Sequence, residues 1–569
     1  MIEHKTEANT SIMGWKSDQR YLTALFCWTI GLVSIFPVPR LFLRGNLLDT
    51  LISYMIIMII IGIPLVLLEL SISQYSRKSI SGSWDLCPFF RGIGYTKVVT
   101  LFIFQIYSNV LNSYSLFYCF TSIPKLEGGN VSRDYINQSN EETFWHNEVL
   151  GMDRILDNKI GEPNWKLVGC LCANMMLVFL ANHRATATVQ NFLPIAFAIY
   201  CTETALLLIF ILVTPGSLNG LYDFISAEVN FDMFVVWKKD AKILDVFQSV
   251  LFSLGIGLGG LSSIGAQTNF RYPVHASTLW VCLINLGAAI LYALMMACLY
   301  GIIGENTTSD IEKIQEEVLH AKPDISHLFT IVPRALEFLP GFQNFWKFIF
   351  YSSMFLKGIT CSVVMASTIL HEIYELKPQL TRRTILCSII FNLFTCLSGW
   401  IFLTNAGATL ENFFNKITYM VLIPLINCFQ ITSIIIFYGL FHFRDDFNFM
   451  LGFPLPSYYQ ITLVSSSLLL PVFTITSMVR YFQEPLGSQA NLIITLQKSY
   501  LTIVLVWIPF MALVRIIRKR DIRKIFLPSR SWGPSEDLKK SRELFDDQYS
   551  VPEFIYEKYL LTNKLEKYD

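Results

Sequence analysis

Three polar side chains stand out because each lies inside a long apolar segment of the chain. They are Glu69, Lys357 and Gln430. A charged group at the centre of a membrane-spanning helix costs a few kcal/mol, so it must face a partner or a water-filled cavity. Lys357, in Leu356-Lys-Gly-Ile-Thr-Cys361, is the most informative of the three, because its ammonium would bring a positive charge to membrane depth.

Glycines interrupt one apolar segment that is otherwise long enough to cross a bilayer. Leu251-Phe-Ser-Leu-Gly-Ile-Gly-Leu-Gly-Gly260 predicts a helix that unwinds, and Gly31, Pro37 and Pro39 break the apolar segment 27–39. Backbone freed at membrane depth is tolerated only where it is buried in protein or lines a cavity. Two broken spans in corresponding halves of a chain predict a transporter built from inverted repeats, with its solute site at the breaks.

Composition also indicates an integral membrane protein. The chain has 569 residues, of which 53% are hydrophobic and 15% charged, and its mean hydropathy is +0.47. The net charge of +1 gives no reason to expect a nucleic-acid partner. Residues 1–20 are polar and lack an apolar core, so we expect no cleaved signal peptide.

Windows of about 20 apolar residues predict an all-α fold of twelve transmembrane helices. The expected spans are 21–43, 48–73, 95–121, 166–182, 190–213, 243–268, 276–303, 346–370, 384–403, 417–441, 459–479 and 495–517. Basic residues mark the cytoplasmic loops, which places both termini in the cytoplasm. The residues that decide this are Arg77, Lys78, Arg91, Lys97, Arg382, Arg383, Arg515, Arg518, Lys519, Arg520, Arg523 and Lys524.

With this topology, residues 122–165 form an extracellular loop, 305–345 an extracellular helical lid, and 518–569 a cytoplasmic tail. Three N-glycosylation sequons, at Asn130, Asn137 and Asn306, fall in outward loops, which favours the plasma membrane. The twelve cysteines lie almost all inside spans, so we expect small buried hydrophobes and no disulfide framework. No catalytic motif is present that would favour an enzyme.

Several short motifs resemble, in the same order along the chain, those of the neurotransmitter:sodium symporters (solute carrier family 6), in particular the amino-acid-transporting branch. They are Gly62-Ile-Pro-Leu-Val-Leu-Leu-Glu69, Gly92-Ile-Gly-Tyr95, Phe144-Trp-His-Asn-Glu-Val-Leu150, Thr214-Pro-Gly216, Val332-Pro-Arg-Ala-Leu336, Thr404-Asn-Ala-Gly407 and Met450-Leu-Gly452. The resemblance covers about residues 15–525. It implies a fold like that of the bacterial leucine transporter, with repeat one at 21–213, repeat two at 243–441, and helices one and six broken.

The resemblance also implies two sodium positions. At the first, the family's ligands correspond to the Thr29 carbonyl, Ser34, the Ser253 hydroxyl and the Asn285 amide, so four oxygens remain. Ser34 replaces a family asparagine. The alternative is that Ser34 and Asn285 only form hydrogen bonds between helices.

The second sodium position departs further from the family. By register it receives the carbonyls of Cys27, Ile30 and Lys357 and the Thr360 hydroxyl, while Cys361 replaces a serine. The Lys357 ammonium could occupy the cation position itself, and a proton would then become a candidate coupling ion. Alternatively, only its backbone lines the position and the side chain extends toward a wet outer vestibule.

The same resemblance argues against a chloride site. Tyr54, Ser253 and Asn285 match three of the family's chloride contacts, but Ser249 and Ala289 replace a glutamine and a serine. We therefore predict no anion dependence.

The implied solute pocket favours an amino acid or similar zwitterion. Gly31 stands where amine-selective members carry an aspartate, so no carboxylate would pair with a monoamine. The family's carboxylate-binding tyrosine aligns with Ser108, although Tyr107 lies one residue, about 100°, away on the helix. The other expected lining residues are Phe252, Gly255, Ile256, Gly257, Thr360 and Ser362. For the apolar ones, helix packing is the alternative.

The family's ion-pair gates are altered as well. The outer arginine aligns with Pro37, and Arg40 lies one helical turn further out. Glu372 and Glu375 lack the family's inner arginine, which should bias the balance between outward and inward states. For Glu69 we favour a structural polar network over a transport role.

The sequence therefore predicts a sodium-driven symporter for a small neutral amino acid, with altered coupling. The alternative is a family member without transport activity that acts as a sensor, scaffold or partner subunit. Membrane lipid is an expected partner, and the sequence leaves the oligomeric state open.

Overall fold

The computed structural model describes residues 14–31, 41, 47–123, 144–150, 162–226, 242–306, 326–341, 343–404, 407–483 and scattered positions from 514 to 542. Within these residues the fold is all-helical, and the one β-bridge joins Pro163 to Thr404. The expectation of an all-α protein is confirmed for this part of the chain.

Seventeen α-helices make up the described fold. They are α2 (Asp18–Thr29), α5 (Leu47–Ile57), α6 (Ile63–Ser76), α7 (Arg91–Ser122), α9 (Trp165–Asn182), α10 (Thr186–Val213), α11 (Ser217–Ser226), α13 (Lys242–Ser253), α14 (Gly260–Ala266), α15 (Val274–Asn306), α17 (Ser326–Leu336), α18 (Gln343–Leu376), α19 (Thr384–Gly399), α20 (Gly407–Ile417), α21 (Ile423–Thr432), α22 (Leu440–Leu451) and α23 (Ser457–Gln483).

Shorter 3₁₀- and π-helical turns connect or extend these helices. They are η1 (Met58–Gly62), η2 (Gly82–Leu86), η3 (Pro88–Phe90), η5 (Phe144–Val149), η7 (Pro378–Arg383), η8 (Trp400–Leu403), η9 (Thr418–Leu422) and η10 (Ser433–Gly439).

Eight helical segments in the described part of the chain are long and apolar enough to cross a membrane. They are Asp49–Ser76, Trp165–Asn182, Thr186–Val213, Val274–Asn306, Asn344–Leu376, Pro378–Leu403, Thr409–Leu451 and Ser457–Gln483. Helices also occupy the expected spans at 95–121 and 243–268. Most of the second half of the span 21–43, and nearly all of 495–517, lie outside the described residues.

The long helices differ in how deeply they are buried. In Asn344–Leu376 the most apolar window is 89% buried, against 33% in Pro378–Leu403. The segment that carries Lys357 is therefore central, whereas α19 presents apolar side chains such as Leu393 and Ile390 outward, as a lipid-facing helix should.

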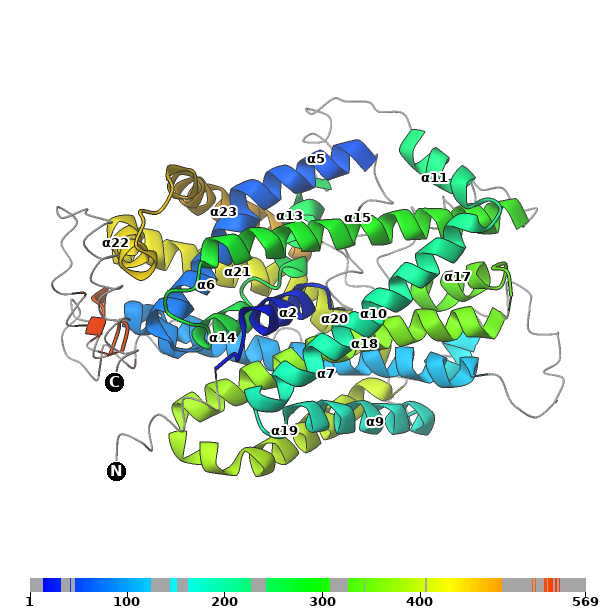
Figure 1. Ribbon diagram of the computed structural model, residues 1–569, viewed down its shortest axis with the longest axis horizontal. Coiled ribbons are helices and arrows are strands. Elements are labelled where there is room, and N and C mark those ends of the chain that lie inside the picture. The colour runs from blue at the N-terminus through cyan, green and yellow to red at the C-terminus, as the bar shows by residue number, and fades with distance from the viewer. Residues whose placement is uncertain are drawn as a thin grey trace, which may run out of the picture.

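Helices α2, α13 and α14 lie near the middle of the bundle in Figure 1. Helices α11 and α17 lie toward one end, and α22 with the red residues near 526–542 lies at the other. Helix α17 falls within the expected extracellular lid, and the rest of that lid at 307–325 lies outside the described residues.

The predicted break at 251–260 is confirmed. Helix α13 ends at Ser253 and α14 begins at Gly260. Between them Gly255, Gly257 and Gly259 have φ values of +63°, +83° and +90°, which only glycine adopts without strain. We call residues 254–259 the unwound segment. Helix α2 ends at Thr29, and residues 32–40 lie outside the described part.

The expectation that Lys97 lies in a cytoplasmic loop is wrong. Lys97 lies in α7, where it is 2% exposed and paired with Glu69. A lysine near the start of a span can point into the protein when it pairs with a buried carboxylate. Lys97 therefore does not indicate which loops face the cytoplasm.

Candidate functional site

Two helices, α2 and α21, contact the unwound segment closely. A Cβ at Gly255 would lie 2.4 Å from Nε1 of Trp28, and a Cβ at Gly257 would lie 2.6 Å from Nδ2 of Asn427. The Asn427 amide donates to the Ile256 carbonyl at 3.2 Å. Glycine is required here because the neighbouring side chains occupy the space that a Cβ would need.

The buried Glu69 carboxylate also holds the segment. Its Oε1 accepts a hydrogen bond from the Gly257 N–H at 3.0 Å. The freed backbone of the break is thus paired with polar side chains of α6 and α21, as backbone at membrane depth must be.

The residues predicted for the first sodium position lie together. The Asn285 amide donates to the carbonyls of Thr29 at 3.2 Å and Ser253 at 2.9 Å. The Ser253 hydroxyl donates to Asn285 Oδ1 at 3.1 Å, and the Tyr54 hydroxyl lies 2.9 Å from Ser253 Oγ. Because both carbonyls meet one amide nitrogen, oxygens from α2, α13 and α15 point to a shared location. We call Thr29, Tyr54, Ser253 and Asn285 the oxygen cluster. Ser34 lies outside the described residues.

The residues predicted for the second position are less well arranged for a cation. The Thr360 hydroxyl donates to the Lys357 carbonyl at 2.9 Å, and the Cys361 thiol to the Trp28 carbonyl at 3.8 Å. Cys27 and Ile30 lie at the end of α2 and are buried. Two of the predicted ligands, the Thr360 hydroxyl and the Lys357 carbonyl, are therefore already hydrogen-bonded to each other.

The Lys357 ammonium is held by a different set of side chains. It donates to Ser353 Oγ at 2.7 Å and Thr204 Oγ1 at 3.0 Å, and it lies 4.4 Å from the centre of the Tyr292 ring. Ser353 is one turn before Lys357 on α18, whereas Thr360 and Cys361 are on the following turn. The side chain follows the normal helical tilt toward the N-terminus and points away from them.

No carboxylate lies within 4 Å of this ammonium among the described residues. Glu203, the neighbour of Thr204, instead accepts a hydrogen bond from Ser352 at 2.8 Å. Lys357 is 4% exposed, so its charge is stabilised by hydroxyl groups and an aromatic face. We call Lys357, Thr204, Ser353 and Tyr292 the lysine cage.

The expected solute-pocket residues are buried around the same break. Phe252 packs edge-on against Phe104 with ring centres 5.7 Å apart, and Phe104 packs in turn against Tyr107 at 5.2 Å. The Ser108 hydroxyl donates to the Gln105 carbonyl at 3.2 Å within its own helix. Gly31, Gly255, Ile256, Gly257, Thr360 and Ser362 are also buried.

The two glutamates at the end of α18 accept hydrogen bonds from serine residues. Glu372 accepts hydrogen bonds from the Ser81 amide at 3.1 Å and from the Ser81 hydroxyl, and Glu375 accepts from the Ser79 amide at 2.6 Å. They therefore fix the turn between α6 and η2 on the end of α18. Arg40, the expected outer gate, lies outside the described residues.

A stretch near the C-terminus docks on this same turn. Asp85 accepts hydrogen bonds from Lys78 and from the Ser531 hydroxyl, both at 2.7 Å. Burial raises the pKa of Asp85, but the bonds from Lys78 and Ser531 and the charge of Arg91 outweigh this, so the pKa lies below its usual value. Asp85 is thus ionised at neutral pH and keeps both bonds.

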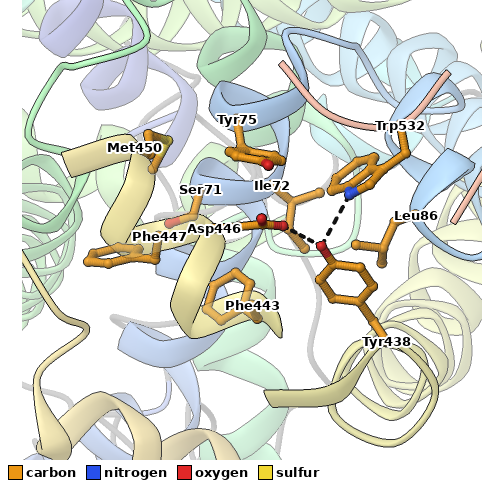
Figure 2. Close-up of a pocket in the computed structure, with 10 residues that line it drawn as sticks. All are labelled: Ser71, Ile72, Tyr75, Leu86, Tyr438, Phe443, Asp446, Phe447, Met450 and Trp532. Atoms are coloured by element: carbon orange, nitrogen blue, oxygen red, sulfur yellow. Dashed lines mark hydrogen bonds between the residues drawn. The ribbon is translucent and has the colours of Figure 1, made fainter. Parts of the chain in front are cut away.

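Figure 2 shows a pocket next to this contact, which Trp532 lines together with side chains of α6 and α22. The Trp532 indole donates to the Tyr438 hydroxyl at 3.2 Å, and Tyr438 donates to Asp446 on α22. Asp446 also forms an ion pair with Arg542 at 3.0 Å. We call residues 526–542 the C-terminal strap, because their described positions join η2 to α22.

Of the predicted glycosylation sites, the structure describes only Asn306. It ends α15, is exposed, and its side-chain amide donates to the Ile302 carbonyl at 2.8 Å. Asn130 and Asn137 lie outside the described residues.

Sequence reasoning missed Trp28 and the lysine cage partners. Trp28 is 3% exposed, and its indole N–H has no hydrogen-bond partner among the described residues. The available signal was an indole N–H donor three residues before Gly31, where the segment 27–39 is first broken. Thr204 and Tyr292 gave no signal, because only packing brings α10 and α15 to Lys357.

The chain belongs to the sodium:neurotransmitter symporter family, which it matches over residues 13–137 and 125–519. The fold and the buried oxygen cluster thus belong to a membrane transporter and not to an enzyme.

Three relatives are similar over most of their length. The mouse sodium- and chloride-dependent neutral and basic amino acid transporter B(0+) is 22% identical, over 93% of this chain and 90% of that protein. A Caenorhabditis elegans sodium- and chloride-dependent betaine transporter is 23% identical, over 81% and 80%. The Xenopus laevis sodium- and chloride-dependent glycine transporter 2 is 22% identical, over 94% and 73%.

Proposed function

We propose that this chain is a sodium-driven symporter that carries a small neutral amino acid or related zwitterion across the plasma membrane. The observation that carries the proposal is the oxygen cluster, in which Thr29, Ser253 and Asn285 from three helices meet beside the unwound segment. In a symporter, the solute and the driving ion must share such a site so that each raises the affinity for the other.

The architecture we propose has twelve spans, with inverted repeats at 21–213 and 243–441. Its support is family membership, together with the end of α2 at Thr29 and the break between α13 and α14. We place both termini in the cytoplasm because the other basic loop residues support that orientation without Lys97. Exposed Asn306 is compatible with an outward-facing, glycosylated end of α15.

Sodium fits the oxygen cluster chemically. It is a hard cation that prefers oxygen ligands, and the cluster offers two carbonyls, a hydroxyl and an amide oxygen. Asn285 now donates its amide to both carbonyls, so ion binding requires this amide to turn. The side chain would thereby exchange two hydrogen bonds for an ion contact and transmit ion binding to α2 and α13.

Lys357 supports altered coupling in a particular form. Its ammonium lies in the lysine cage one turn from Thr360 and Cys361, so we propose that it acts as a fixed positive charge beside the second position. Such a charge disfavours a second sodium ion by repulsion, without occupying the ligand positions itself. One sodium ion per cycle would then be coupled.

The expectation that chloride plays no part has no support from the relatives, all three of which are named sodium- and chloride-dependent. Tyr54, one of the matching chloride contacts, is hydrogen-bonded within the oxygen cluster. We therefore propose that an anion assists sodium there, with Ser249 and Ala289 weakening its binding relative to the family.

The solute proposal depends on donors at the breaks. Trp28 presents an unpaired indole N–H against Gly255, which suits a carboxylate oxygen of the solute. Gly31 provides no carboxylate for a monoamine, and the relatives carry amino acids, betaine or glycine by name. Tyr107 and Phe252 would close the apolar side of the pocket.

Uptake into proteoliposomes tests the proposal. Purified full-length chain should accumulate at least one radiolabelled neutral amino acid or betaine under an inward sodium gradient, and Trp28→Phe should weaken solute binding. Absence of uptake for a broad panel of zwitterions by correctly folded protein would favour the sensor, scaffold or partner-subunit alternative.

A further inference from the structure

A buried ion pair connects three helices to the unwound segment. Lys97 on α7 contacts Glu69 on α6 at 2.5 Å, and the side chains of the two residues are 3% and 0% exposed. The same ammonium donates to Gln430 Oε1 on α21 at 2.5 Å. Glu69 Oε1 in turn accepts the Gly257 N–H at 3.0 Å. One oxygen atom thus links Lys97 to the backbone of the break.

The geometry makes Lys97 responsible for the position of Glu69. The second carboxylate oxygen, Oε2, is buried and has no hydrogen-bond partner among the described residues. Both contacts of the carboxylate therefore pass through Oε1. Without the ammonium, the carboxylate would keep a single backbone donor in an apolar surrounding, which is unfavourable for a charge.

Helix α21 holds the unwound segment by two routes. Asn427 donates directly to the Ile256 carbonyl, and Gln430, about one turn later, reaches Gly257 through Lys97 and Glu69. Adjacent residues of the break are thus tied to the same helix. A shift of α21 would move both together.

We propose that Lys97 is a positioning residue that fixes the unwound segment through Glu69 and so sets solute affinity. The inference rests on the proposed function, because the segment is assigned to the solute pocket there. Lys97 touches neither solute nor ion. It orders the Gly257 backbone before binding, which lowers the entropic cost of binding.

Backbone hydrogen exchange on the purified full-length chain tests this without any transport. Lys97→Met should speed exchange at residues 254–259 by at least about tenfold, because Glu69 loses the contact that orients it. Lys166→Met is the control, since Lys166 is 71% exposed and its loss should leave exchange at the break unchanged. Faster exchange throughout α7 and α21, with no excess at the break, would overturn the positioning role.

Two further variants keep the test decisive if Lys97→Met does not fold. Lys97→Arg retains the charge and should protect the break as the natural chain does. Lys97→Met combined with Glu69→Gln removes both charges, leaves an amide oxygen for the Gly257 N–H, and should recover most of the protection. If hydrogen exchange at residues 254–259 in the double variant is as fast as in an exposed loop, the proposed path through Glu69 is contradicted.

Uptake then separates this inference from the proposed function. In the folded double variant, the half-saturating solute concentration should lie within about threefold of the natural chain, and in Lys97→Met about tenfold higher, with half-saturating sodium unchanged. Equal solute constants in all variants would overturn the effect on affinity. Faster exchange in Lys97→Met, with no uptake by any variant or by the natural chain, would contradict the proposed function while supporting the positioning role.

Discussion

The oxygen cluster and the lysine cage are both buried, the first at one candidate cation position and the second about one helical turn from the other, but only the cage contains an ionisable cationic group. The cluster holds only neutral oxygen and amide groups, bonded to one another across α2, α13 and α15. The cage holds an ammonium that Thr204, Ser353 and Tyr292 stabilise. A position made of neutral oxygens needs an external cation, whereas an ammonium nearby makes the binding of a second cation unfavourable.

Under the proposed function, this difference means that the scaffold keeps one ion position and alters the other. Thr29, Ser253 and Asn285 offer oxygen atoms at the first proposed position. At the second, by the family resemblance, Cys361 replaces a serine, and the Lys357 ammonium lies about one helical turn away. Changing residues in the two regions should therefore affect sodium dependence in opposite ways.

Asn285→Ala should have the largest effect. The variant loses an amide oxygen and leaves the Thr29 and Ser253 carbonyls without their donor. We expect the half-saturating sodium concentration to rise at least about tenfold, or uptake to be lost. Asn392→Ala is a matched control, because Asn392 is buried on α19 and bonds within its own helix turn. Similar sodium constants for both variants would place the ion elsewhere.

Lys357→Met with Cys361→Ser should have the next largest effect, on the cage side of the comparison. Removing the fixed charge and restoring a hydroxyl makes the second position available to an ion. We expect the Hill coefficient for sodium to rise from about one toward two, with uptake changed several-fold. Lys166→Met removes a lysine charge that is 71% exposed and lies outside the cage, and it should leave the coefficient unchanged. A coefficient of about two in the natural chain would show that the ammonium does not exclude an ion.

Replacing chloride with gluconate should have a smaller effect, of about two- to fivefold on uptake. Ser249 bonds to Tyr419 at 2.8 Å. By the family resemblance, it stands where a glutamine would be, so under the proposed function the oxygen cluster lacks that amide. Ser249→Gln should therefore strengthen the chloride response. Uptake that is identical in chloride and gluconate for both proteins would restrict the cluster to cations.

Trp532→Ala should have the smallest effect on ion dependence, because the C-terminal strap lies outside both regions. It removes the indole bond to Tyr438 and the packing against Tyr75. We expect half-saturating sodium within about twofold of the natural value, while the melting temperature falls by a few degrees. A large change in sodium dependence would mean that the strap controls the ion positions.

Local chemistry made part of this structure predictable. The break at 251–260 followed from its glycines, because glycine lacks a Cβ and can adopt the positive φ values seen there. The residues of the oxygen cluster were named from the family resemblance, and α2, α5, α13 and α15 bring them together. The all-helical fold followed from apolar segment length.

Contacts between distant segments were not predictable. Lys97 beside Tyr95 resembles a loop charge in sequence, and only packing of α6 and α21 against α7 supplies Glu69 and Gln430 as its partners. The direction of Lys357 likewise depends on α10 and α15. The docking of the C-terminal strap on Asp85 has no signal in the local sequence.

The most direct test of the central claim is sodium-dependent uptake by purified protein in liposomes. We predict that an inward sodium gradient drives accumulation of a neutral amino acid or betaine, with a Hill coefficient for sodium of about one, and that Asn285→Ala abolishes it or shifts it at least about tenfold. Uptake that does not respond to sodium, or that Asn285→Ala leaves intact, would contradict the assignment of the oxygen cluster as the ion position.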